Sequence, residues 1–164
     1  MTETSDEPFS PGPGGSVDVT LPDDVREMLR SLATSFRELL TEHTPSSDPS
    51  LQRLFPPAYP DDPLRNLDYE RLAAPDLLRD RLDALDLLGR TAAATRLSSD
   101  EAMAWMRALN DMRLVFGTRL DVTEETEAED LRDAGARQTF ELYMHLGWFV
   151  DTLVHALEMP EAAG

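Results

Sequence analysis

The sequence predicts an all-α, single-domain bundle of about four long amphipathic helices. A proline-rich extended connection follows the first helix, and a disordered tail precedes it. The chain has 164 residues, of which 41% are hydrophobic, enough for one domain with a core of its own. Apolar side chains recur at three- and four-residue intervals in four separate stretches, the spacing of amphipathic helices. Prolines crowd the segment between the first two stretches and exclude a continuous helix there.

Residues 1–16 are rich in proline and glycine, a composition typical of disordered segments. We therefore expect a disordered tail over 1–16, a single helical domain over 17–159 and a short C-terminal tail over 160–164. Val17, Val19 and Leu21 alternate with polar residues, which indicates a weak edge strand.

The first long helix is expected to begin with Thr20 and Asp23 in a capping-box-like arrangement and to end near His43. Pro22 then lies in its first turn. Its core-facing stripe is Val25, Met28, Leu29, Leu32, Phe36, Leu39 and Leu40.

The proline-rich segment covers residues 45–63 and favours an extended or polyproline-like conformation. A short helical turn is expected over 50–54, and another near Tyr69 and Leu72. Phe55 and Tyr59 are the candidate anchors of this segment on the bundle.

Three more long helices follow. The second is expected from Pro75, in its first turn, to Arg96. The third begins with a capping box formed by Ser98 and Glu101 and is expected to stop at Gly117. Residues 121–133 form a loop or a solvated turn, and the last helix spans about 137–158. Its expected core stripe is Phe140, Tyr143, Gly147, Val150, Val154 and Leu157.

The chain is strongly acidic, with 32 acids against 15 bases and a net charge of −17. Residues 121–133 alone hold seven acids against one arginine. Duplex DNA binding needs a positive surface, so autonomous DNA binding is not expected. An acidic surface suits a basic protein partner or serves solubility alone.

Several chemistries are excluded by residue type. All 15 bases are arginine and there is no cysteine, which removes lysine Schiff bases, thiolate nucleophiles and thiol redox sensing. No catalytic or phosphate-binding motif is present, so we expect a non-enzymatic protein without cofactor or metal. No apolar run of 18 residues occurs, and we expect a cytoplasmic protein without a membrane span.

Polar and aromatic residues in two places are candidates for a partner-binding surface. An architectural role is the alternative for each of them. Arg107 and Asp111 can pair one helical turn apart. A metal site on the last helix, formed by Glu141, His145, Asp151 and His155, is a further alternative. The candidate partner-binding residues are Arg53, Phe55, Tyr59, Asn110, Arg113 and Arg119. If an arginine of the cluster that contains Arg107 and Arg113 is buried, Asp61, Asp62 and Asp68 are its candidate partners.

Several segments together resemble an actinobacterial family first known only as a domain of unknown function and later named after AosR, an oxidative-stress transcriptional regulator. They are RLFPPAYPDDP (53–63), YERL (69–72), DLLRDRLDALDLL (76–88), LSSDEAMAWMRALNDMRLVFGTRLDVTEE (97–125) and LYMHLGWFVDTLVHAL (142–157). The resemblance covers about residues 20–158, and ALNDMRLVFGTRL is its most specific block.

The resemblance implies a transcription-associated protein that acts with a sigma factor or RNA polymerase on oxidative-stress or cysteine-metabolism genes. Genes of this family commonly adjoin that of the ClpS protease adaptor, so a partner in ClpS-linked proteolysis is the alternative. Redox sensing in the family is tied to cysteines. This chain has none, so a thiol signal would have to come through a partner.

Overall fold

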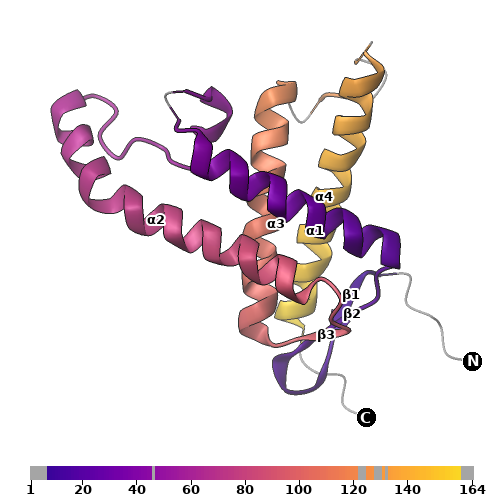
Figure 1. Ribbon diagram of the computed structural model, residues 1–164. Helices are drawn as coiled ribbons and strands as arrows, with labels where there is room; N and C mark the ends of the chain where they lie inside the picture. Colours follow the sequence, from indigo (N-terminus) through magenta and orange to yellow (C-terminus); the bar gives the residue numbers. More distant parts are fainter. Residues whose placement is uncertain (1–6, 46, 122–124, 128–130, 132, 160–164) are drawn as a thin grey trace, which may run out of the picture.

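The computed structural model describes residues 7–45, 47–121, 125–127, 131 and 133–159. Its long helices are α1 (Asp23–Glu42), α2 (Pro63–Thr91), α3 (Ser99–Leu120) and α4 (Ala134–Glu158). Helices α3 and α4 lie side by side, α1 crosses them, and α2 packs on α1 and α3 (Figure 1). The predicted helical bundle is confirmed, with a small sheet added at one end.

The sheet has three short antiparallel strands in the order β1 (Phe9–Pro11), β2 (Val17–Val19) and β3 (Arg96–Leu97). Phe9 lies opposite Val19, and Val17 lies opposite Leu97. The prediction of disorder over 1–16 is therefore wrong for residues 7–16. The predicted strand is present over 17–19, but it is the central strand and not an edge.

The proline- and glycine-rich segment forms the tight turn that joins β1 to β2. It contains a short helix, η1 (Pro13–Gly15), in which Gly14 and Gly15 have φ angles of 66° and 81°. Glycine adopts this left-handed conformation without the steric cost that other residues incur. Here, a composition that is typical of disordered segments forms a tight turn.

The turn directs Phe9 into the core, where its side chain is only 1% exposed. Its ring makes edge-to-face contacts with Trp105 of α3, at 6.1 Å between centroids, and with Phe149 of α4, at 6.0 Å. The Trp105 indole is fully buried and donates a hydrogen bond of 2.6 Å to Thr91 Oγ1. The N-terminal strand thus closes the core over α3 and α4.

Arg26 of α1 joins the sheet to the helices. Its guanidinium donates hydrogen bonds to the carbonyl oxygens of Val19, Leu21, Ala92 and Ala94, at 2.7–3.3 Å. These carbonyls belong to the ends of β2 and α2, where the chain leaves regular structure and the backbone needs partners.

The start of α1 differs from the prediction. Pro22 is its N-cap residue and no side chain caps the first turn, so the capping box of Thr20 and Asp23 does not form. The predicted end is confirmed, because His43 is the C-cap residue.

Helix α2 is longer than predicted at one end and shorter at the other. It begins at Pro63, with Asp62 as N-cap, and continues through Pro75 to Thr91. Pro75 therefore lies inside the helix and not in its first turn. The expected short turn near Tyr69 belongs to this helix, and a turn and β3 replace the expected last helical turn.

The capping box of Ser98 and Glu101 at the start of α3 is confirmed. The predicted stop at Gly117 is wrong, because α3 continues to Leu120. The helix ends at Asp121, whose φ angle of 52° provides the left-handed cap. Gly117 is buried inside the helix. Glycine has no side chain at this position, but it does not end the helix.

Helix α4 begins at Ala134, three residues before the predicted start, with Asp133 as N-cap. Its buried face is also rotated from the predicted stripe. Phe140 and Val150 are buried as predicted, whereas Tyr143 and Val154 are only half-buried. The buried residues are Phe140, Leu146, Phe149, Val150, Leu153 and Ala156.

Among the described residues, no helix is both long enough and apolar enough to cross a bilayer.

Candidate functional site

Two pockets lie on either side of the outer surface of α3. The pocket between α2 and α3 has a volume of about 360 Å³, and the one between α3 and α4 about 280 Å³. The first is lined by Leu77, Asp80, Arg81, Ala84, Arg107, Asn110, Asp111 and Leu114. The second is lined by Arg113, Tyr143, Met144, Gly147, Trp148 and Asp151.

Asp111 lies in the wall of the first pocket, on α3, with 6% of its surface exposed. Its carboxylate accepts a hydrogen bond from Arg81 of α2 at 2.5 Å. Arg81 also donates to the Leu54 carbonyl at 2.7 Å, and its guanidinium lies 5.3 Å from the Phe55 ring. One arginine thus connects α2, α3 and the proline-rich segment.

Burial raises the pKa of Asp111, and the Arg81 hydrogen bond and charge only partly offset this. The ion pair satisfies the carboxylate in a site from which most water is excluded. Asp111 does not pair with Arg107, as the sequence spacing suggested, but with a residue 30 positions away.

The second pocket contains one of the candidate residues, Arg113. Arg113 lines it and donates a hydrogen bond of 2.8 Å to Asn110 Oδ1. Asn110 itself lines the first pocket, so this pair lies on the ridge between the two. The expected partners Asp61, Asp62 and Asp68 do not pair with Arg113.

Trp148 and Met144 of α4 form the exposed apolar rim of the second pocket. Their side chains are 46% and 56% exposed and lie together at one pocket, whereas exposed hydrophobic residues that are scattered singly are ordinary. His145 lies beside this rim, with its ring 6.1 Å from Trp148 in an edge-to-face arrangement. We call Asn110, Arg113, Met144, Trp148 and Asp151 the α3–α4 face.

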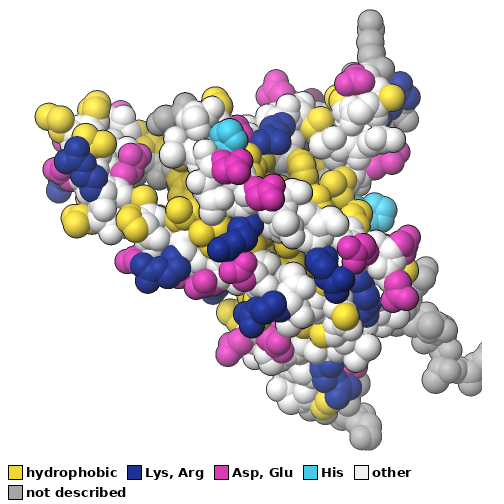
Figure 2. All heavy atoms as spheres, viewed as in Figure 1, with side chains coloured by type: hydrophobic (Ala, Val, Ile, Leu, Met, Phe, Trp, Pro, Cys, Tyr) yellow, Lys and Arg dark blue, Asp and Glu magenta, His cyan; other side chains and the backbone are white. Residues whose placement is uncertain are grey.

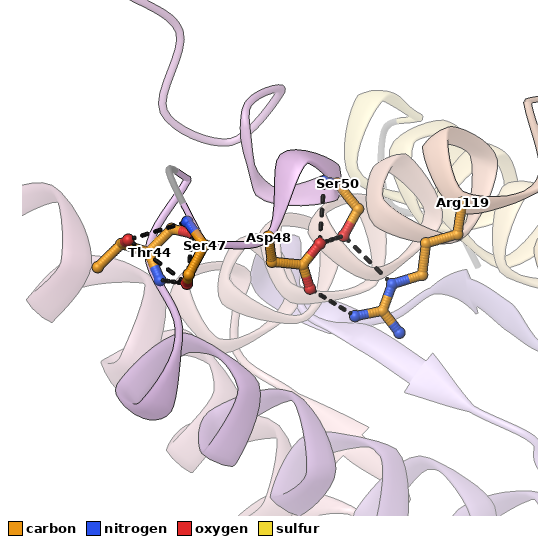
Figure 3. Close-up of polar contacts among 5 residues, drawn as sticks. All are labelled: Thr44, Ser47, Asp48, Ser50 and Arg119. Atoms are coloured by element: carbon orange, nitrogen blue, oxygen red, sulfur yellow. Dashed lines mark hydrogen bonds and ion pairs between the residues drawn. The ribbon is translucent and has the colours of Figure 1, made fainter.

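Arg119 is a structural residue at the end of α3. Its guanidinium donates hydrogen bonds to Ser50 Oγ at 3.2 Å and to Asp48 Oδ2 at 2.8 Å (Figure 3). Asp48 caps the short helix η2 (Pro49–Leu51), close to where the sequence predicted a helical turn. The hydrogen bond from the Ser50 hydroxyl lowers the pKa of Asp48, and the hydrogen bond from Arg119 lowers it further. Thr44 and Ser47 close the preceding turn through their own hydrogen bonds.

The Arg119→Ala variant is expected to lose about 1 kcal/mol of unfolding free energy at neutral pH, because a half-exposed charged hydrogen bond is removed. Because the pKa of Asp48 is lowered in the folded state, its carboxylate stabilises the fold at pH values above the ordinary carboxyl pKa. This contribution is lost as the pH falls and Asp48 is protonated. The loss should therefore shrink in acid. Urea unfolding at several pH values measures it.

Arg53→Ala is the matched control, since Arg53 is exposed and no ion pair or hydrogen bond links its side chain to the described residues. An equal loss in both variants, or an Arg119 effect independent of pH, would contradict the proposed role.

Phe55 and Tyr59 have different positions. Phe55 is half-buried against the core, as expected. Tyr59 is not a core anchor, because it packs on the first half of α2, away from the core, and stays exposed. Its ring lies 6.2 Å from Tyr69 and 4.6 Å from the Arg65 guanidinium.

The metal alternative gains no geometric support. Among the described residues, no three histidine or acidic side chains lie close enough to bind one ion. Glu141, His145, Asp151 and His155 are all exposed on α4.

Sequence reasoning did not identify Arg81 or Trp148 as members of these sites. Arg81 lies among several arginines in the DLLRDRLDALDLL segment, and nothing local distinguishes it. Trp148 could have been found from the helix itself. Placing Leu146, Phe149 and Leu153 on the core side leaves Trp148 on the outer side.

The chain matches the family described as Domain of unknown function (DUF2017) over residues 6–157. No curated protein and no solved structure matches it. The matched region contains both pockets, the small sheet and the four long helices except for the last residue of α4. The chain therefore belongs to the DUF2017 family.

Proposed function

We propose that this protein is a non-enzymatic regulator that binds a basic surface of a sigma factor or of RNA polymerase through the α3–α4 face. The observation that carries the proposal is the exposed pair Trp148 and Met144 at the rim of a pocket that also contains Arg113 and Asp151. Tryptophan, methionine and arginine are enriched in protein interfaces, and tryptophan and arginine often dominate their binding energy.

The charge of the chain supports a basic partner. A net charge of −17 attracts positive surfaces and accelerates association with them, more strongly at low salt. It opposes binding to nucleic acid phosphates. A regulator of oxidative-stress or cysteine-metabolism genes, as the AosR resemblance implies, would thus act by contacting the transcription machinery and not the promoter.

The test is a binding titration of the purified protein with RNA polymerase core, with holoenzyme and with free sigma factors at two salt concentrations. Saturable binding that weakens at the higher salt is expected. Trp148→Ala should raise the dissociation constant by about 30-fold, the equivalent of ~2 kcal/mol for a central interface residue. Promoter output in a reconstituted transcription assay should change with the wild-type protein and not with this variant.

Met144→Ala and Met159→Ala form a matched pair, because both side chains are exposed to a similar extent, 56% and 48%. The two residues are 15 positions apart, about 22 Å along a helix. Only Met144→Ala should weaken binding. If no polymerase component binds, or if neither Trp148→Ala nor Met144→Ala changes the dissociation constant, the proposal is wrong. Binding to ClpS alone would favour the proteolysis alternative.

A further inference from the structure

The pocket between α2 and α3 is lined by two charged side chains that the fold does not use. Asp80 of α2 and Arg107 of α3 are both exposed in its lining. Neither side chain forms an ion pair or a hydrogen bond with another described residue. Arg81 and Asp111 neutralise each other in the same wall. The pocket thus offers one free positive charge and one free negative charge.

Asn110 adds a hydrogen-bond donor beside Arg107. Its side-chain oxygen accepts from Arg113 at 2.8 Å. Because arginine only donates, the amide oxygen must be the atom that faces Arg113, and the amide nitrogen keeps its N–H groups for another acceptor. No described residue accepts from this nitrogen. Asn110 is half-buried in the pocket lining and lies one turn after Arg107 on the same side of α3. The two residues can therefore hold one carboxylate together.

The contacts between α2 and α3 show that the two helices run in roughly opposite directions along the pocket. Trp105, near the start of α3, donates a hydrogen bond to Thr91 at the end of α2. Asp111, farther along α3, pairs with Arg81, which comes earlier in α2. Residues later in α3 therefore face residues earlier in α2, and this order defines the two ends of the pocket.

One end of the pocket is apolar and the other is charged. Leu77 and Leu114 line the apolar end, beyond the buried ion pair. Arg107 and Ala84 line the opposite end, where the short alanine side chain leaves room beside the guanidinium. Leu77 is the last exposed large hydrophobic residue of α2, and Figure 2 shows hydrophobic side chains gathered on the first half of this helix. The apolar end of the pocket thus adjoins an apolar surface.

The free charges select the class of ligand. A doubly charged anion such as a phosphate ester would meet Asp80 and the net charge of −17, both of which repel it. A simple cation would leave Arg107 unpaired. A zwitterion satisfies both free charges and, because it has no net charge, is not repelled by the chain. The pocket volume of about 360 Å³ is at the small end for ligand sites, so the ligand must be small.

We propose that the pocket between α2 and α3 binds a free α-amino acid with an aliphatic side chain. Its carboxylate accepts hydrogen bonds from Arg107 and Asn110. Its ammonium group donates to Asp80, which lies between the two ends of the pocket. Its side chain packs against Leu77 and Leu114. An aliphatic amino acid joins both charges and an apolar group at one carbon atom, so one small molecule uses both ends of the pocket.

Isothermal titration calorimetry of the full chain with L-leucine, L-isoleucine and L-valine tests this. At least one of them should bind at one site per chain, with a dissociation constant of about 1 mM or below. Truncated forms of the tightest ligand separate its groups: the amine without the carboxylate, the acid without the amino group, and glycine without the side chain. For leucine, the first two are isopentylamine and isocaproate. Each truncated form should bind at least about fivefold more weakly.

Arg107→Gln and Asp80→Asn should each raise the dissociation constant at least about fivefold. Their unfolding temperatures should be unchanged, because neither side chain has a partner in the described fold. Arg71→Gln and Asp83→Asn are the matched controls. Both residues are exposed on α2 and lie outside the pocket lining, and each control changes the net charge as its pocket variant does. Both control variants should bind the amino acid as the wild type does.

The proposal is wrong if none of the three amino acids binds saturably, or if the amine or the acid alone binds as tightly as the amino acid. It is also wrong if the control variants weaken binding as much as the pocket variants do. The titrations contain no polymerase, so their result is independent of the test of the α3–α4 face.

Discussion

Replacing Phe9 with alanine is expected to lower the free energy of unfolding by about 3–5 kcal/mol, the usual cost of removing a buried phenylalanine. The ring is 1% exposed and contacts both Trp105 and Phe149. Its loss would leave a cavity between the sheet and two helices. Chemical unfolding followed by tryptophan fluorescence measures the change, and the Trp105 emission should shift as its surroundings become more polar.

Pro13→Ala is a control in the same hairpin, since Pro13 is exposed and its side chain is not part of the core. It should change stability by less than about 1 kcal/mol. If Phe9→Ala were equally mild, the N-terminal strand would contribute little to the fold. Residues 7–16 would then behave as the sequence composition suggested.

Replacing Asp111 with alanine is expected to cost about 3 kcal/mol, the lower end of the range for breaking a buried ion pair. Arg81 would lose its charged partner and keep the Leu54 carbonyl as a hydrogen-bond acceptor and its contact with the Phe55 ring. The Arg81→Leu variant should also be destabilised, because the buried Asp111 carboxylate would have to take up a proton. The double variant Arg81→Leu/Asp111→Ala should lose less than the sum of the two, since neither charge is left alone.

The dependence of stability on pH provides a second readout for Asp111. Because burial raises its pKa, the folded state binds this proton more tightly than the unfolded state does. The contribution of Asp111 to stability therefore falls as pH rises from the ordinary carboxyl pKa to the raised one. Asp111→Asn should remove that decline. The coupling of Arg81 and Asp111 would be contradicted if the stability of Asp111→Asn depended on pH as that of the wild type does. It would also be contradicted if the stability losses of the single variants added up to the loss of the double variant.

The helical class and several helix ends could be predicted from local sequence. The capping box of Ser98 and Glu101 involves residues three positions apart, so neighbouring side chains suffice to form it. The end of α1 at His43 follows from Pro45, which cannot continue the helix. Predictions that depend on a single residue are wrong in two places. Pro75 and Gly117 predict helix boundaries, but both lie inside helices whose other residues pack well enough to outweigh the local cost.

The sequence by itself determined that this chain is a helical, acidic protein without cysteine or lysine, because composition and periodicity are local properties. The tertiary structure decided which faces are buried and which side chains meet. Phe9 is a core residue only because α3 and α4 bring Trp105 and Phe149 to it. Arg81 and Asp111 are partners only because α2 packs against α3. Contacts between residues that are distant in the sequence depend on how the helices pack. They cannot be predicted from the spacing of apolar residues within one helix.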